Sequence, residues 1–406
     1  MRKHKIIAFF ILILLSINVI CVSCAYYDNS TPYYNLFQIE LELFQFSTIY
    51  ENESMPSFDF YNQALENASK YPLYSYNLLL DCYRAILLYN LTKRIKMMGN
   101  KTVVETFILE VQDTLSNITK IVNNVVPKTL ASLEWLDLAK REIISATDYF
   151  SQADGYYTNK DYNLTIASLI LADSSLHKAN GFIYLANKRN IENAVFVNTS
   201  KLLKTVKYVA SNWITHVESA ISFYENIGYE QYLSYPKLIL NQSKDYFSKE
   251  LYYVAIMNAA SAEALVDYYT HRYLTHSNQS EILTVCKTHF NYAELTMNQI
   301  YDDNDIDAPF AESTIELAKL HLEDAGKEEN ESSAGAIAGI SIQESLIAQK
   351  QAWAALDLKN AIKQELNEDD TCEEASQTNT MEIQYIMLTI IAIEFLLLVI
   401  LWLKRK

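Results

Sequence analysis

The chain has 406 residues, with 33 lysines and arginines against 49 aspartates and glutamates, and a formal net charge of −16. This acidic balance disfavours binding to nucleic acid or to anionic lipid headgroups, because both repel a negative surface. Glycine and proline are scarce, 7 and 6 in all, which disfavours a sheet protein because its many turns need them. We therefore expect an all-α protein, either a multi-helix bundle or an α-solenoid of helical hairpins.

The N-terminal segment has the layout of a secretory signal peptide. A basic start at residues 2–5 precedes an apolar run at 6–20 and small residues at 23–25. We expect residues 1–25 to be removed on export. Two alternatives stay open: an uncleaved signal anchor, and a lipoprotein modified at Cys24.

Apolar residues recur at helical spacing along most of the chain. Leu130, Leu133 and Leu136 begin one such stripe, and Trp135 widens it. The prolines fall between the periodic segments, where a missing N–H group does not break a helix. In chain order, we expect helices at residues 33–50, 58–70, 73–98, 101–126, 129–153, 162–187, 191–227, 236–248, 251–273, 281–301, 310–325 and 333–366.

These helices suggest an N-terminal helical region at 26–127 and a repeat-like region at 128–364. The repeat consists of an isoleucine followed seven residues later by an acid, at a spacing that places both on one helix face. It occurs at Ile166 and Asp173, at Ile256 and Glu263, and at Ile337 and Glu344. The period is about 80 to 90 residues, which suits stacked helical hairpins. Coincidence in a chain rich in Tyr, Ala and Ile is the alternative.

The same tripeptide stands before two of these repeat-like helices, as Asp148-Tyr149-Phe150 and as Asp245-Tyr246-Phe247. A Tyr-x3-Ile start and an Ala-rich helix then follow at 162–175 and 252–265. With these features, residues 140–360 resemble the membrane-tethered helical regions that accompany Lon-type protease domains in exported archaeal proteins, and more loosely tetratricopeptide-like hairpins. The Lon-type serine and lysine motifs are absent from the sequence, so the resemblance implies a helical part without catalytic residues.

Sequons for N-glycosylation are frequent in the chain. Chance placement would give about five, so the observed number is roughly a twofold excess. An Asn-rich composition is the alternative explanation. The sequon asparagines are Asn29, Asn52, Asn67, Asn90, Asn100, Asn117, Asn163, Asn198, Asn241, Asn278 and Asn330.

Cys286 and His289 are three residues apart, a spacing that places two zinc ligands on one helix face. His271 and His276 lie nearby in the sequence, but five residues separate them and they diverge on a helix. The alternative is a pair of partly buried histidines and an ordinary cysteine. Because the sequence contains no His-Glu-x-x-His, phosphate loop or Gly-x-Ser-x-Gly motif, we assign no cofactor and no catalytic residue.

An acidic loop suggests a second candidate metal site, for calcium. An EF-hand frame beginning at Asp303 fails, because Ala308 takes the glycine position and Thr314 takes the place of the bidentate acid. A looser site could still use Asp303 and Asp305. The alternative is an interhelical loop in which Asp307 caps the helix that follows.

The C-terminal run at 383–403 holds about 20 mainly apolar residues, which matches a hydrocarbon core about 30 Å thick. An acidic linker at 365–382 precedes it and a basic tail at 404–406 follows, so we expect the C-terminus in the cytoplasm. Glu394 lies near the middle of the span. Such a carboxylate either faces a partner or is tolerated in its protonated form.

Three cysteines would remain after signal removal, namely Cys82, Cys286 and Cys372. An odd number excludes a complete disulfide framework, so packing has to hold the core. Cys372 lies in the acidic linker, where two chains joined through Glu394 could cross-link. We therefore expect a possible homodimer through these two residues.

Together these features predict a type I, single-pass, glycosylated cell-surface protein. Setting aside three basic residues at each end leaves 27 basic residues against 49 acids, a net charge of about −22 for the outer portion. The acidic helical ectodomain would be a binding or scaffold module for a protein or cell-surface partner. The alternative is an exported, membrane-anchored hydrolase or a degenerate relative of a Lon-type protease.

Overall fold

The computed structural model describes residues 32–49, 58–192, 198–270, 279–301, 305–328, 330 and 332–365. Within these ranges every regular element is a helix, so the all-α prediction is confirmed and the fold is a helical bundle. None of the helices in these ranges is long and apolar enough to cross a membrane. The predicted signal peptide, the linker beyond residue 365, the span at 383–403 and the tail at 404–406 lie outside them.

Contacts divide the chain into two compact bodies, one up to Asn90 and the other from Leu91 onward. The N-terminal body contains α2 (Pro32–Ile49), α3 (Phe58–Asn67) and most of α4 (Pro72–Met98). Both α2 and α4 begin at a proline, which fits the first helical position because that N–H group has no partner in the helix. The predicted boundary near residue 127 follows the end of α5 (Asn100–Asn124) by three residues, and it stays a prediction.

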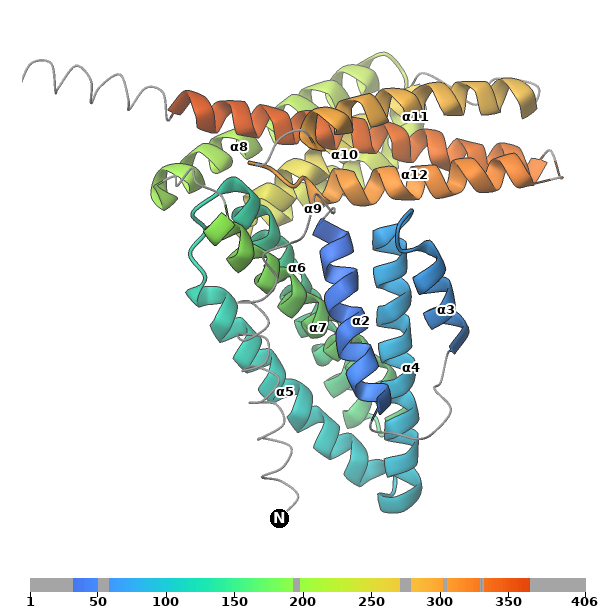
Figure 1. Ribbon diagram of the computed structural model, residues 1–406. Helices are drawn as coiled ribbons and strands as arrows, with labels where there is room; N and C mark the ends of the chain where they lie inside the picture. The colour runs from blue at the N-terminus through green and yellow to red at the C-terminus, as the bar shows by residue number, and fades with distance from the viewer. Residues whose placement is uncertain are drawn as a thin grey trace, which may run out of the picture. The chain divides into compact units, whose positions relative to one another are not determined.

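Besides the end of α4, the described part of the C-terminal body contains three sets of three long helices, which we call triplets (Figure 1). Within each triplet the helices pack against one another. Figure 1 shows the helices of the third triplet running side by side. The first triplet is α5 (Asn100–Asn124), α6 (Leu130–Thr158) and α7 (Tyr162–Glu192). The second is α8 (Thr199–Asn226), α9 (Ser234–Ser248) and α10 (Tyr252–Thr270), with the short helix η1 (Glu230–Tyr232). The third is α11 (Gln279–Tyr301), α12 (Pro309–Lys327) and the helix at 332–365.

The hairpin turns of the first two triplets have the same geometry. Lys160 and Glu250, 90 residues apart, both adopt the left-handed conformation, with φ of 61° and 60°. In each turn the next residue donates its N–H to the carbonyl five residues back, from Asp161 to Tyr156 and from Leu251 to Tyr246, at 3.0 Å in both cases. This pattern closes a helix C-terminus with a Schellman motif. The offset agrees with the period of about 80 to 90 residues expected from the sequence.

The turns also correct the pairing of the repeated tripeptide. Tyr156 occupies the position of Tyr246, whereas Phe150 lies inside α6, well before the turn. The predicted end of that helix at residue 153 was therefore wrong. The helix continues through Gly155 to Thr158, because a single glycine weakens a helix without ending it.

The predicted helix at 191–227 was also wrong at its start. Ile191 belongs to α7, and α8 begins only at Thr199. The Asn198 side chain accepts a hydrogen bond from the Ser200 N–H at 3.0 Å, which makes it the N-cap of α8. This cap fixes the start of the helix.

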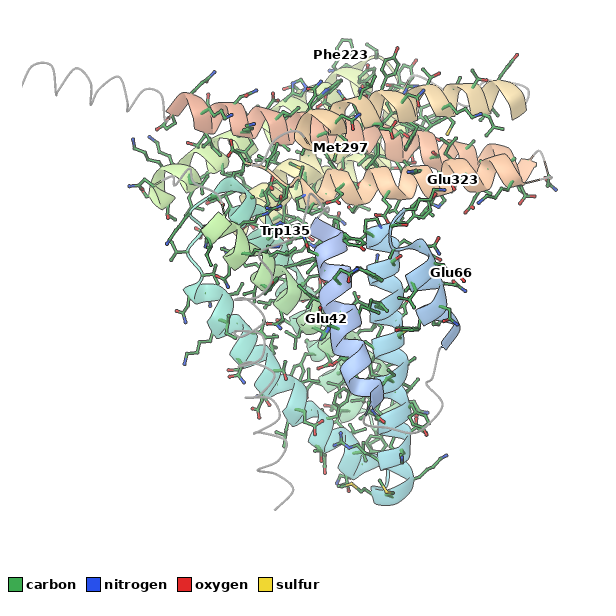
Figure 2. All side chains as sticks on the ribbon, viewed as in Figure 1. Glu42, Glu66, Trp135, Phe223, Met297 and Glu323 are labelled. Carbon is green, nitrogen blue, oxygen red and sulfur yellow. The ribbon has the colours of Figure 1, made fainter. Side chains whose placement is uncertain are left out.

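One apolar core joins the three triplets. It includes Leu133 of α6, Val206 of α8, Met297 of α11 and Leu358 of the last helix, all almost completely buried. Helix α10 passes through the interior and is buried on most of its surface, with alanines that let neighbouring helices approach closely. The positions of Trp135 and Met297 among the helices are visible in Figure 2.

Candidate functional site

The most unusual chemistry among the described residues is a set of buried polar side chains around the first half of α6. Glu134 and Asp137 are one helical turn apart, so their carboxylates lie on the same side of the helix. They are flanked by Leu133, Leu136 and Leu138, and all five residues are buried. Trp135, labelled in Figure 2, is also completely buried. Charged groups in such a place need partners, because burial without them is costly.

Glu134 finds its partners at the start of α12, in the third triplet. Its Oε2 accepts hydrogen bonds from the N–H groups of Asp307 and Ala308, at 2.9 and 3.1 Å. Ala308 is left-handed, with φ of 45°, and Pro309 begins the helix without an N–H group. The Glu134 carboxyl therefore caps a helix that lies more than 170 residues further along the chain.

The expectation that Asp307 caps this helix was wrong. The Asp307 side chain accepts hydrogen bonds from Arg189 Nε at 2.8 Å and from Arg189 Nη2 at 2.6 Å. It also accepts one from Trp135 Nε1 at 2.6 Å. The two-pronged pairing with a guanidinium stabilises the buried carboxylate more than a local cap would, so the side chain turns toward α6 and α7.

Asp137 makes a similar contact with the second triplet. Its Oδ2 accepts a hydrogen bond from the N–H of Tyr253, in the first turn of α10, at 3.1 Å. Lys140 Nζ lies 3.8 Å from the other carboxyl oxygen. One face of α6 therefore caps a helix in each of the other two triplets. We call Glu134, Trp135, Asp137, Arg189 and Asp307 the α6 clamp.

Burial changes the pKa of two carboxyl groups in the clamp. It raises the pKa of Glu134 to about 8, and the charge of Asp307 adds to the shift, while the two N–H groups and Arg189 oppose it. Burial also raises the pKa of Asp137 to about 6, against the pull of Lys140 and the Tyr253 N–H. Glu142, one turn further on, is different. Burial would raise its pKa, but the ion pairs with Lys178 and Arg141 outweigh that effect and lower it.

The clamp is built to hold helices together. Glu134, Trp135 and Asp137 have almost no exposed surface, so a dissolved substrate has no route to them. Every clamp carboxyl is bound to a helix N-terminus, a guanidinium or an indole N–H. This arrangement lacks a nucleophile and supports a structural role.

A second polar cluster links α8, α10 and the last helix. Lys350 Nζ lies 2.6 Å from Glu263 and 3.2 Å from Asp267, and it also faces the ring of Trp353 at 5.4 Å. His216 Nε2 of α8 is 3.5 Å from Glu263. We call Lys350, Glu263, Asp267 and His216 the lysine cluster.

Two of the three acids of the sequence repeat make contacts between helices. Glu263 belongs to the lysine cluster, and Glu344 Oε2 lies 2.6 Å from His321 Nδ1. Each of these two acids connects the third helix of its triplet to another helix. At these two positions the repeated acid therefore has a physical role as an interhelical contact.

The proposed zinc ligands lie in different surroundings. Cys286 is a buried free thiol in an apolar cluster of the third triplet, and burial raises its pKa. His289 is half-buried, and burial lowers its pKa. Within the part of the chain that the structure describes, no three His, Cys, Asp or Glu side chains come together in a way that could hold a metal ion. His271 and His276 lie outside that part.

The candidate calcium ligands are only partly described. Asp305 Oδ2 lies 3.6 Å from Lys363 Nζ, an ion pair between the loop and the last helix. Asp303 lies outside the described residues, as do Cys372 and Glu394. Cys82, in α4, is buried and is not part of a disulfide.

Eight sequon asparagines fall within the described residues, and six of them are exposed. Asn67 and Asn90 are half-buried. Two of the exposed ones are helix caps: Asn198 caps α8, and Asn330 accepts hydrogen bonds from the N–H groups of Ser332 and Ser333 at 3.0 and 3.1 Å. Asn29, Asn52 and Asn278 lie outside the described residues. The exposed asparagines are Asn100, Asn117, Asn163, Asn198, Asn241 and Asn330.

Three comparisons, with protein-family models, with curated proteins and with solved structures, find no match for the chain. The similarity to Lon-associated helical regions therefore stays a resemblance.

Proposed function

We propose that the protein is a single-pass cell-surface protein whose acidic helical ectodomain is a binding or scaffold module. In this proposal the three triplets form a short α-solenoid, tethered by the span at 383–403 with its C-terminus in the cytoplasm. The partner is a protein or another component of the cell surface.

The repeated hairpin turn at Lys160 and Glu250 is the observation that carries this proposal. The same backbone conformation and the same hydrogen bonds recur after 90 residues. Recurring helical units stack into extended frameworks, and such frameworks present broad surfaces that bind other molecules. The clamp adds to this by fixing the three triplets to one another.

The exposed sequons support display outside the cell. At Asn198 and Asn330 the side-chain oxygen accepts the capping hydrogen bond, and the nitrogen that would carry a glycan is left for modification. Sequons also stand at the start of the first helix of each triplet, at Asn100, Asn198 and, directly before α11 in the sequence, Asn278. At Asn198 and Asn330 helix capping is a reason for the asparagine besides glycosylation.

Surface proteolysis of intact cells tests the topology. The full-length chain carrying a C-terminal epitope should lose its helical region to added trypsin, while the epitope stays protected until the membrane is opened. A chain that resists trypsin on intact cells but is cut after lysis would contradict the proposal.

Three substitutions at one site separate glycosylation from capping. Ser200→Ala destroys the sequon but keeps the Asn198 cap, and Asn198→Asp does the same with a carboxylate. Asn198→Ala removes both. If the site is glycosylated, all three variants lose the mass of one glycan, and only Asn198→Ala also loses stability, by about 1 kcal/mol. An intact mass equal to that of the bare polypeptide in the wild type would rule out glycosylation.

Self-association through Glu394 and Cys372 belongs to the same proposal. A proton shared between two Glu394 side chains would bring the two linkers together, and the Cys372 thiols could then cross-link. Non-reducing electrophoresis should show a dimer that disappears in Cys372→Ser and weakens in Glu394→Leu. A dimer that is unchanged in both variants would end this part of the proposal.

A further inference from the structure

The turn from α8 through η1 into α9 exposes an unusual number of large apolar side chains. Phe223, Ile227 and Leu238 are more than half exposed, at 58%, 53% and 51%, and Tyr232 and Tyr235 are at 39% and 44%. Single exposed apolar residues are ordinary, but five within sixteen residues are a concentration of the kind that marks interaction sites. Figure 2 shows Phe223 at the upper edge of the drawn helices. We call residues 223–238 the aromatic turn.

Four rings of the turn form a continuous series. The ring centroids of Phe223 and Tyr224 are 5.3 Å apart, those of Tyr224 and Tyr229 are 5.9 Å apart, and those of Tyr229 and Tyr232 are 6.2 Å apart. Two of the pairs are edge-on, an arrangement that aromatic rings favour. The exposed rings are therefore held in place by their neighbours.

The backbone of the turn is also well fixed. Gly228 takes a left-handed conformation, with φ of 93°, and the Tyr229 N–H bonds to the Tyr224 carbonyl at 3.0 Å. Leu233 is completely buried and anchors the turn, and Lys237 of α9 pairs with Glu225 of α8. A preorganised aromatic surface loses little conformational freedom when it binds, which is why Tyr and Phe are common in binding sites.

Charge indicates the kind of partner. Lys237 and Lys244 are each paired with a glutamate of α8, Glu225 and Glu218. Glu230 is exposed, lies between Tyr229 and Tyr232 in the sequence, and forms no ion pair among the described residues. The whole chain carries a net charge of −16. An exposed carboxylate on the same short helix as an exposed tyrosine suits a cation, because the ring face and the carboxylate both attract positive charge.

We propose that the aromatic turn binds a cationic segment of a protein partner. In this complex a lysine or arginine side chain lies over the tyrosine rings and pairs with Glu230. Apolar residues beside it cover Phe223, Ile227 and Leu238. This inference rests on the proposed function as a binding module, and it identifies where that module binds and what it recognises.

Peptide binding to the purified full-length protein, in a neutral detergent, tests the inference. The probe is a fluorescein-labelled twelve-residue peptide of alternating lysine and leucine, with a glutamate and leucine peptide as the counterpart. Fluorescence anisotropy should show binding of the lysine peptide only, and rising salt should weaken it because exposed charges are screened.

Four variants locate the site. Tyr232→Ser with Tyr235→Ser, and separately Glu230→Gln, should each weaken binding about fivefold or more. Tyr208→Ser removes a tyrosine of α8 that is more exposed, at 66%, and lies 15 residues before Phe223, and Glu294→Gln removes an exposed acid from α11. These two controls should keep the wild-type affinity, and circular dichroism should be the same for all variants.

The inference fails if the tyrosine variants bind as tightly as the wild type, if Glu294→Gln weakens binding as much as Glu230→Gln, or if the glutamate peptide binds equally well. These outcomes are independent of the trypsin experiment. A surface-displayed protein without peptide binding would overturn this inference alone. A chain that is never exposed outside the cell but binds the peptide at the turn would overturn only the proposed location.

Discussion

The α6 clamp and the lysine cluster both join helices of different triplets, but they manage charge in different ways. The clamp lies in the interior, where Asp307 is paired with Arg189 and Glu134 faces two helix N–H groups. The lysine cluster keeps part of its surface in water, and its acids hold Lys350 ionised. Burial would lower the pKa of Lys350, but Glu263 and Asp267 outweigh that effect and raise it. The stability that the buried clamp contributes should therefore depend on pH, and the stability that the partly exposed lysine cluster contributes should depend on salt.

The largest effect should follow from Arg189→Met. The substitution leaves the Asp307 carboxylate buried without its cationic partner, which should lower the free energy of unfolding by about 3–5 kcal/mol. Arg94→Met is the matched control, because Arg94 makes the same two-pronged pairing with Glu110, but on an exposed face. It should cost no more than about 1 kcal/mol. If urea unfolding shows that both variants lose the same free energy of unfolding, burial does not distinguish the two ion pairs.

The clamp should also make stability depend on pH. The pKa of Glu134 is about 8 in the folded protein, against an ordinary value of 4.5. The folded state therefore keeps a proton that the unfolded state has released, and stability falls as the pH rises from about 4.5 to about 8. The raised pKa of Asp137 acts in the same direction: it lowers stability as the pH rises from 3.8 to about 6.

Glu134→Gln should remove most of this dependence, because the amide can accept the same N–H bonds but does not titrate. The variant should match the wild type near pH 4.5 and exceed it at pH 9 by about 2–4 kcal/mol. Thermal unfolding measured across this range gives the comparison. Parallel curves for the two proteins would mean that Glu134 is not responsible.

Lys350→Met should have a smaller effect than Arg189→Met. The substitution removes charge-assisted hydrogen bonds that are only partly buried, so we expect a loss of about 1.5 kcal/mol. The loss should shrink in 0.5 M salt. As a control, Lys327→Met removes an exposed lysine that is 3.8 Å from Asp324 and should change nothing measurable. A loss that is independent of salt and equal to that of Arg189→Met would remove the distinction between the clusters.

The smallest effect concerns the repeated turn. Lys160→Gly and Glu250→Gly should each stabilise the protein by up to about 1 kcal/mol, because glycine takes the left-handed conformation without strain. Lys204→Gly, at an exposed site inside α8, should destabilise it by about the same amount. Urea unfolding of the three variants measures the expected gain in stability at residues 160 and 250 and the expected loss at residue 204. Destabilisation by glycine at residue 160 or 250 would contradict the shared geometry.

Local signals predicted the helices well. The scarcity of glycine and proline and the apolar stripes identified all the helices of the third triplet within two residues. The apolar pattern does not mark the start of α8 at Thr199. Asn198 belongs to a sequon, and the same side chain is also a good N-cap. The pattern Asn-x-Ser/Thr is compatible both with a glycosylation site and with a helix N-cap, and the sequence alone does not distinguish the two.

The clamp was not predicted, because its partners are distant in sequence. Asp307 was assigned to the nearest helix start, whereas Arg189 and Trp135 are 118 and 172 residues away. A signal was nevertheless present: Glu134 and Asp137 interrupt a stripe that is otherwise leucine and tryptophan. A charged residue inside such a stripe points to a buried contact, but its partner depends on tertiary structure.

The long reach of the clamp has a consequence for how the protein unfolds. Arrays of helical repeats can lose their units one after another, because each unit touches only its neighbours. Here α6 caps α12 directly, across the intervening triplet, so the last triplet cannot open without exposing the Glu134 carboxyl of the first. We expect the C-terminal body to melt in one cooperative transition. Its folding should be slow for a helical protein, because the caps form only after a long stretch of chain has been brought together.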